Sequence, residues 1–153
     1  MKKYFLTIFT IIFLPFLGSA QNLNEELFQS IIKNDKEKVI QLLKNNADVN
    51  YVKSKGPWMT VNMLVLAINN DNFDIAKILI ANKVKVNWKD GFQTSALMYA
   101  VTKGNKEMSV LLLDNGDDVH ANDGKGNTVL SAAKESGNKE LINYIYEKQK
   151  SIK

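Results

Sequence analysis

The chain repeats itself along almost its whole length. Three similar tracts begin 33 positions apart, at Leu64, Leu97 and Leu130. A fourth tract begins at Leu27, 37 positions before Leu64, which indicates an insertion of about four residues between the first two units of the chain. A fixed period of this length is typical of stacked arrays, in which no single unit can bury its apolar face alone. We therefore expect an array, and arrays of this kind mostly bind other molecules and seldom catalyse.

The third tract shows what one unit contains. A first apolar stripe with helical spacing begins at Leu97 and stops at Gly104, and a second begins at Met108 and stops at Gly116. Each stripe is too short to form a stable isolated helix in water, so packing must hold it in place. Short polar stretches rich in Gly, Asp and Asn separate the units and predict tight connections. The sequence therefore predicts four stacked helix hairpins joined by projecting turns.

Equivalent positions in the units support this pairing of helices. Short side chains recur at one place, where they would let the paired helices approach closely: Ser30, Ala67, Ala100 and Ala133. Just past the second helix, Asn46 and Gly116 tolerate the left-handed backbone that ends a helix, whereas Lys83 suits that place less well.

Several segments match a known repeat. They are Asp123-x-x-Gly126-x-Thr128-x-Leu130, Leu111-Leu112-Leu113-x-x-Gly116 and Ala47-Asp48-Val49-Asn50. These segments resemble the ankyrin-repeat unit, and the resemblance runs from about Leu27 to Lys148. No unit keeps the family's Thr-Pro-Leu-His tetrapeptide, which corresponds to residues 62–65, 95–98 and 128–131. The resemblance implies an all-α ankyrin-repeat solenoid of about four units, at residues 24–50, 51–87, 88–120 and 121–150 of a domain at 21–153.

The N-terminal segment has the composition of a secretory signal peptide. Met1-Lys2-Lys3 is positive, residues 4–17 are almost wholly apolar, and Gly18-Ser19-Ala20 supplies small residues. We expect residues 1–20 to be a signal peptide that is cleaved after Ala20. The apolar run is shorter than the roughly twenty residues that span a bilayer. An uncleaved membrane anchor is the competing interpretation, and no Cys follows the run to carry a lipid.

The composition favours an exported bacterial protein. Every positive side chain is Lys, and Asn and Ile are abundant, which is typical of AT-rich bacterial genomes. We therefore expect a periplasmic or secreted protein, monomeric and without stable membrane insertion after cleavage. The net charge of +4 falls to about +2 once Lys2 and Lys3 are removed, and the chain has no Arg, so nucleic acid is not an expected partner. With no Cys there are no disulfides.

The chain offers little for catalysis. Its single histidine, His120, takes the place that Asn50 and Asn87 hold in other units, and we interpret it as a turn residue. With no Cys and no second His, a zinc or other transition-metal site is not expected. No phosphate-binding glycine loop and no nucleophile elbow is present. We predict a protein that is not an enzyme and uses no cofactor and no metal.

The predicted function is binding of another protein. In ankyrin arrays the partner usually meets the turn tips and the exposed, concave side of the first helices. The resemblance carries these positions over to Trp58, Met59, Val61, Asn69, Asn70, Phe92, Thr94, Thr102, Lys103, Lys125, Asn127, Glu135 and Ser136. Trp58 lies in the lengthened segment between the first two units, and exposed aromatic residues are favoured interface anchors.

The aromatic residues also allow other interpretations. Trp58 and Trp88 could instead pack against each other and neighbouring turns. Within protein binding, an inhibitor or immunity-type role rests on analogy. A different function is binding of peptidoglycan or another envelope glycan, with Trp58, Trp88 and Tyr51 as stacking platforms. A glycan site would align exposed rings with amide side chains, whereas a protein site would mix rings with scattered charges. An enzyme would need a clustered acid/base pair, which the sequence does not offer.

Overall fold

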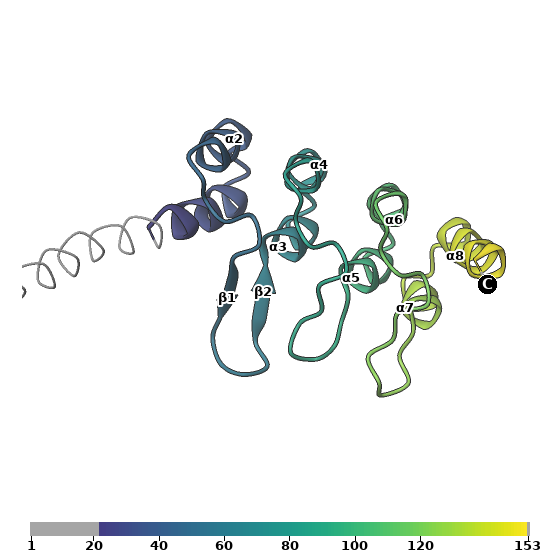
Figure 1. Ribbon diagram of the computed structural model, residues 1–153. Helices are drawn as coiled ribbons and strands as arrows, with labels where there is room; N and C mark the ends of the chain where they lie inside the picture. The colour runs from purple at the N-terminus through teal and green to yellow at the C-terminus, as the bar shows by residue number, and fades with distance from the viewer. Residues whose placement is uncertain (1–21, 153) are drawn as a thin grey trace, which may run out of the picture.

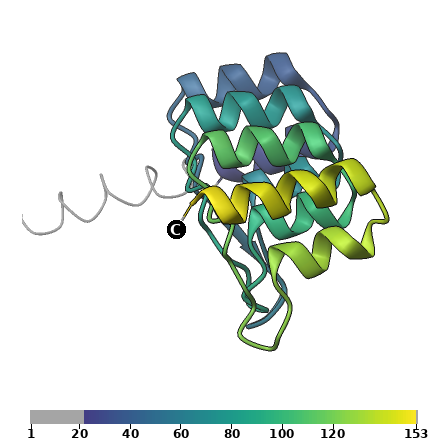
Figure 2. The same ribbon diagram turned by 90° about the vertical axis from the view of Figure 1, so that its right-hand side faces the viewer.

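The computed structural model describes residues 22–152, and the predicted signal peptide at residues 1–20 lies outside this part of the chain. Within it, pairs of helices stack side by side, and loops between successive pairs project to one side (Figure 1). Viewed along the stack, the helices lie in rows and the projecting loops gather at one end of the molecule (Figure 2). Among the described helices, none is long and apolar enough to cross a membrane.

The elements follow the order of the repeats. A helix at residues 22–32 pairs with α2 (Lys36–Lys44). The hairpin of β1 (Val52–Ser54) and β2 (Thr60–Asn62) leads into α3 (Met63–Asn69) and α4 (Phe73–Ala81). The remaining pairs are α5 (Ala96–Thr102) with α6 (Lys106–Asp114), and α7 (Val129–Glu135) with α8 (Lys139–Ser151). The expected all-α solenoid of paired helices with projecting turns is confirmed.

The core lies between the helices of neighbouring units. Helices α3, α5 and α7 form an inner row in which each contacts the next, and each also packs on its own partner, α4, α6 or α8. Because it has neighbours on several sides, α3 buries five of its seven residues. The short side chains expected at close approaches, Ser30, Ala67, Ala100 and Ala133, are all buried.

Other side chains cap the inner helices where the family's tetrapeptide is missing. The side-chain oxygens of Asn62 and Ser95 accept hydrogen bonds from backbone N–H groups in the first turns of α3 and α5, at 2.8 and 3.2 Å. Thr128 does the same for α7 at 3.1 Å. Each cap satisfies one of the N–H groups that a helix N-terminus leaves without a partner. Asn and Ser therefore replace the lost Thr in this role.

The lengthened connection forms the first hairpin. Its strands β1 and β2 pair antiparallel, whereas the next two hairpins each have one isolated bridge, Lys89–Ser95 and Asn122–Thr128. The tip of the first hairpin is residues 55–59, closed by the N–H of Lys55, which donates to the carbonyl of Met59 at 2.9 Å. We call residues 55–59 the arm. The extra residues predicted between the first two units thus build a longer projection with its own strand pair.

Candidate functional site

A groove on the hairpin side brings part of the predicted set together. Its volume is about 340 Å³, within the roughly 300–1,000 Å³ of ordinary ligand pockets. Its walls come from the helix at residues 22–32, the first two hairpins and α5. We call it the aromatic groove, and it is lined by Phe28, Lys53, Lys55, Trp58, Met59, Thr60, Val61, Asp90, Phe92 and Tyr99.

Large apolar side chains of the aromatic groove are open to solvent. Trp58 is 62% exposed, Met59 63% and Phe92 47%. Trp88, by contrast, is partly buried and packs against the core. Soluble proteins seldom leave adjacent large apolar residues this exposed unless the patch meets another molecule. Between the two interpretations of Trp58, its exposure favours the role of an anchor over that of a packed residue.

The next hairpin holds the arm in position. A Cβ added to Gly91 would lie 2.6 Å from the Cα of Trp58 and 2.7 Å from its carbonyl oxygen. Only a glycine therefore lets the backbone of this loop lie directly against the arm. The N–H of Gly91 also donates to Oγ1 of Thr60 at 3.0 Å. These contacts determine where Trp58 stands relative to Phe92.

A buried carboxylate organises the second hairpin. Asp90 is 4% exposed, and its Oδ1 accepts the N–H groups of Phe92 and Thr94 at 2.8 and 2.9 Å. Its Oδ2 accepts the hydroxyl of Tyr99 at 2.6 Å. Burial and this hydrogen bond raise the pKa of Tyr99 above its usual range, so the hydroxyl stays protonated and keeps donating. Both oxygens of Asp90 are thus used within the protein.

A lysine joins the first hairpin to the N-terminal helix. The Nζ of Lys53 lies 2.6 Å from each carboxylate oxygen of Glu25 and 5.1 Å from the ring centroid of Phe28. The ion pair, followed by a hydrogen bond from Gln29, lowers the pKa of Glu25. The positive charge of Lys53 is therefore largely matched within the protein.

Other predicted residues lie away from the aromatic groove. They cluster around the C-terminal ends of α3, α5 and α7: Asn69, Asn70, Thr102, Lys103, Glu135 and Ser136. Some have partners inside the protein. Lys103 donates to the carbonyl of Asn69 at 3.1 Å and pairs with Asp71 at 3.0 Å. The hydroxyl of Ser136 donates to the carbonyl of Ala133 at 2.7 Å. The structure therefore does not gather the whole predicted set into one site.

The remaining predicted residues are Lys125 and Asn127 in the third hairpin and Thr94 in the second. Lys125 is exposed, and its Nζ lies 5.7 Å from the ring centroid of Phe92. The amide of Asn127 donates to Oδ2 of Asp123 at 2.6 Å, so it shapes the loop. Thr94 is half-buried in the second hairpin, where its N–H bonds Asp90. Lys125 is thus the member of the third hairpin that comes close to an exposed ring of the groove.

Sequence reasoning missed six of the lining residues: Phe28, Lys53, Lys55, Thr60, Asp90 and Tyr99. Phe28 is only 9% exposed and belongs to the core cluster, so its apolar spacing looked like ordinary packing. Tyr99 occurs within the apolar stripe of α5, and its half-buried hydroxyl is recognisable only with Asp90 in place. A comparison of the units would have singled out Lys53. It lies 37 positions before Asp90, the offset between the first two units, and so takes the place that Asp90 and Asp123 hold in the other hairpins.

The three rings expected to bind a glycan differ in their exposure. Tyr51 and Trp88 are both partly buried and pack against the core. Neither lines the aromatic groove that holds Trp58. Of the three rings, only that of Trp58 is both exposed and part of the aromatic groove.

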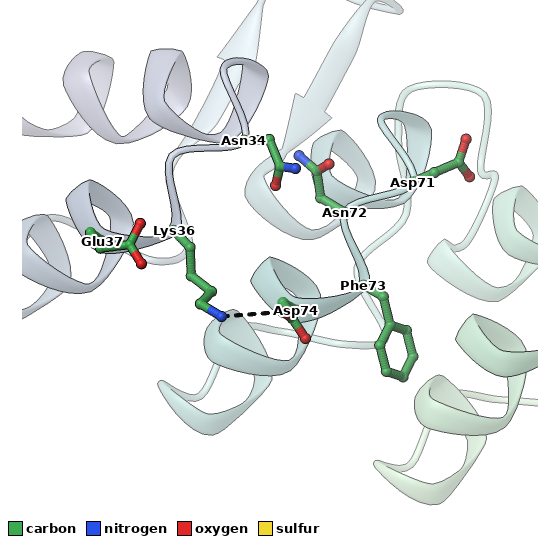
Figure 3. Close-up of a pocket in the computed structure, with 7 residues that line it drawn as sticks. All are labelled: Asn34, Lys36, Glu37, Asp71, Asn72, Phe73 and Asp74. Atoms are coloured by element: carbon green, nitrogen blue, oxygen red, sulfur yellow. Dashed lines mark hydrogen bonds and ion pairs between the residues drawn. The ribbon is translucent and has the colours of Figure 1, made fainter.

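A second hollow lies at the opposite end of the first helix pairs. It has a volume of about 460 Å³ and is lined by Asn34, Lys36, Glu37, Asp71, Asn72, Phe73 and Asp74. Figure 3 shows Lys36 reaching across to Asp74, at 3.2 Å. The amide of Asn72 is used as well, since it donates to the carbonyl of Ile31 at 2.8 Å. This hollow is larger than the aromatic groove, but Lys36, Asp74, Asp71 and Asn72 already have partners within the protein, Asp71 through its ion pair with Lys103.

Side chains also join neighbouring units on the turn following each second helix. Oδ1 of Asn50 accepts the N–H of Lys85 at 2.7 Å, and Oδ1 of Asn87 accepts the N–H of Asp118 at 3.0 Å. His120 takes the equivalent place, and its Nε2 donates to the carbonyl of Ile152 at 2.9 Å. This geometry agrees with a turn residue. Within residues 22–152, no group of three or more metal-ligating side chains is placed to hold an ion.

Comparison with known proteins agrees with this architecture. The family model for ankyrin repeats, in three copies, matches residues 27–123 and 63–153. No curated protein matches the chain in sequence. Ankyrin repeats typically serve as non-catalytic modules for protein–protein interaction. Because these matches span well over half of the sequence and the paired helices follow the same repeat, the chain belongs to the ankyrin-repeat family.

Proposed function

We propose that this ankyrin-repeat protein is exported to the periplasm or secreted, and that it binds a partner protein through the aromatic groove and the hairpin tips. Within that function we favour an inhibitor or immunity-type role, in which the repeat protein holds an enzyme or toxin. The binding residues we assign are Trp58, Met59 and Phe92, with Val61 in the wall between the arm and the core.

One observation carries this proposal. Trp58, Met59 and Phe92 are exposed together on one groove, although each would be expected in a core. Interfaces concentrate their binding free energy in a few large side chains, and truncating such an anchor often costs about 2 kcal/mol or more. The backbone of the arm also packs directly against Gly91, which supports the arm before any partner binds. A site that is already shaped loses less entropy when a partner binds.

The experiment is a pull-down from envelope extract with the mature protein and a Trp58→Ala, Phe92→Ala double variant. We expect the partner to be retained by the unchanged protein and lost by the double variant. Ile32→Ala with Tyr146→Ala is the matched control, because both side chains are 46% exposed and neither lines the groove. Circular dichroism of each variant checks that the fold is intact. Equal retention of the same partners by all three proteins would show that the groove is not the interface.

Export has a separate test. Mass spectrometry of the protein isolated from its native cells should find an N-terminus at Gln21 if the leader is cleaved as proposed. Peptides containing Lys2 and Lys3 in the mature protein would contradict cleavage. This result bears on localisation and leaves the binding site untouched.

A further inference from the structure

The hairpins present positive charge to solvent. The charged residues of these segments are Lys53, Lys55, Lys89, Asp90, Asp123 and Lys125. The two acids are buried, at 4% and 8% exposure. Asp90 is bound as described, and Oδ1 of Asp123 accepts the N–H groups of Lys125 and Asn127 at 2.8 and 3.0 Å. The outer helices differ, because α2, α4, α6 and α8 carry acids and lysines mixed along each helix. Apart from these two buried acids, the charged side chains of the three hairpins are therefore all lysines.

The four lysines differ in whether their ammonium groups already have a bonded partner. Hydrogen bonds lower the pKa of the Asp123 carboxyl, and the charge of Lys125, which lies beyond ion-pair distance, adds to this effect. Lys53 is matched by Glu25 at 2.6 Å, and Lys89 donates to the carbonyl of Asn122 at 2.9 Å. Lys55 and Lys125 form no ion pair with any residue of the part described, 22–152. A partner carboxylate would find these ammonium groups available, and it would not have to displace an existing ion pair.

These lysines flank the apolar anchors. Lys55 belongs to the arm and lines the same groove as Trp58 and Met59. Lys125 approaches from the next hairpin, with its Nζ 5.7 Å from the ring centroid of Phe92. Positive charge thus flanks the solvent-exposed apolar surface formed by Trp58, Met59 and Phe92. Such an arrangement is complementary to a segment that alternates acidic residues with a bulky apolar side chain.

We propose that the partner enters the aromatic groove with a short acidic segment, whose bulky apolar side chain packs between Trp58 and Phe92 while its carboxylates face Lys55 and Lys125. This inference deepens the proposed function and rests on it. Single-stranded nucleic acid would also meet rings and lysines, but this chain has no Arg and carries little net positive charge once the predicted leader is removed.

The test begins with selection of peptides from a random display library on the full chain. Enriched peptides are then synthesised with a fluorescent label, and their affinity is measured by anisotropy at low and high ionic strength. We expect them to combine Asp or Glu with Trp, Phe or Leu, and to bind more weakly as salt screens the charges. A thymidine oligonucleotide and the chain's own self-association, by sedimentation, are measured beside them.

The variant Lys55→Glu, Lys125→Glu should weaken binding about tenfold or more, since each reversal replaces attraction with repulsion. Lys33→Glu with Lys139→Glu is the control: it changes the net charge equally, but these exposed lysines lie outside the groove. Trp58→Ala with Phe92→Ala should abolish binding whatever the charge of the peptide.

The outcomes separate the two proposals. Neutral or basic enriched peptides, an equal loss in the control pair, or preferential binding of the oligonucleotide would overturn the acidic segment. If the chain forms a dimer and Trp58→Ala dissociates it, the occupant of the groove is a second copy of the chain and not an acidic segment of another protein. Neutral or basic peptides, or an equal loss in the control pair, would leave the proposed function standing if the Trp58→Ala, Phe92→Ala variant still failed to bind the enriched peptides. No enrichment, or enriched peptides that bind every variant equally, would count against both.

Discussion

Gly91→Ala tests whether the arm is held by the hairpin that follows it. The added Cβ would lie 2.6 Å from the Cα of Trp58, 2.7 Å from its carbonyl oxygen and 2.9 Å from the carbonyl oxygen of Pro57. All three are backbone atoms, so no side-chain rotation can relieve the overlap. Overpacking of this kind typically costs about 1–3 kcal/mol. We therefore expect Gly91→Ala to lower the free energy of unfolding by that amount and to displace Trp58.

A double-mutant cycle makes this expectation specific. Deleting residues 55–58 shortens the first hairpin to the spacing of the other two, which bridge at Lys89–Ser95 and Asn122–Thr128. The deletion removes the atoms that the new methyl group would meet. In this shortened background, Gly91→Ala should change the free energy of unfolding by less than about 0.5 kcal/mol.

Urea unfolding followed by far-UV circular dichroism gives the four free energies. Tryptophan fluorescence reports the displacement, because Trp58 changes its surroundings while Trp88 stays packed. An equal loss of stability in the full-length and shortened backgrounds would refute the reasoning. No loss in either background, with unchanged fluorescence, would refute it as well.

The other predictions concern single side chains, each measured by urea unfolding. Lys83 has a φ of +67°, so Lys83→Gly should stabilise the protein by about 1 kcal/mol, whereas Lys85→Gly, outside the left-handed region, should not stabilise it. Burial raises the pKa of Asp117 from 3.8 to about 6, so between these values the folded state holds more proton than the unfolded state. The free energy of unfolding should therefore fall as pH rises through this window, by on the order of 3 kcal/mol at most. Asp117→Asn should flatten the dependence of this free energy on pH. An unchanged dependence would contradict the assignment to Asp117. Asn72→Ala removes the donor that reaches the Ile31 carbonyl at 2.8 Å and should lower the free energy of unfolding by about 1–3 kcal/mol. The control Asn82→Ala removes an exposed amide and should lower it far less. Equal losses would argue against a stabilising role for the hydrogen bond between the first two units.

The repeat period was enough to predict the stacked helix pairs. Apolar positions return every 33 residues at Leu64, Leu97 and Leu130, and the first two of these are fully buried. Helical spacing within a unit and a constant offset between units both follow from local physics. The left-handed residue after α2, α4 and α6 was predictable for the same reason, although Lys83 adopts this backbone despite its Cβ.

The aromatic groove was only partly predictable. The insertion and Trp58 are visible in the sequence, yet the contact between Gly91 and the arm joins segments that belong to different units. Carrying family positions over unit by unit treats all hairpins as equal. This assumption placed Thr102 and Glu135 beside the hairpin residues, although they lie at the far ends of α5 and α7. No spacing rule could show that a longer first hairpin would bring Trp58 near Phe92.

The contact of the arm with Gly91 has a consequence for how binding and folding depend on each other. The arm is supplied by one unit and rests on the next, so the groove exists only while these two units are stacked in register. Each repeat contacts only its neighbours, and such arrays open locally at single interfaces. A ligand in the groove therefore stabilises the interface between the unit that carries the arm and the unit that carries Gly91, and raises the free energy needed to open that interface. Mutations that loosen this interface should weaken the ligand's affinity without touching any residue that the ligand contacts.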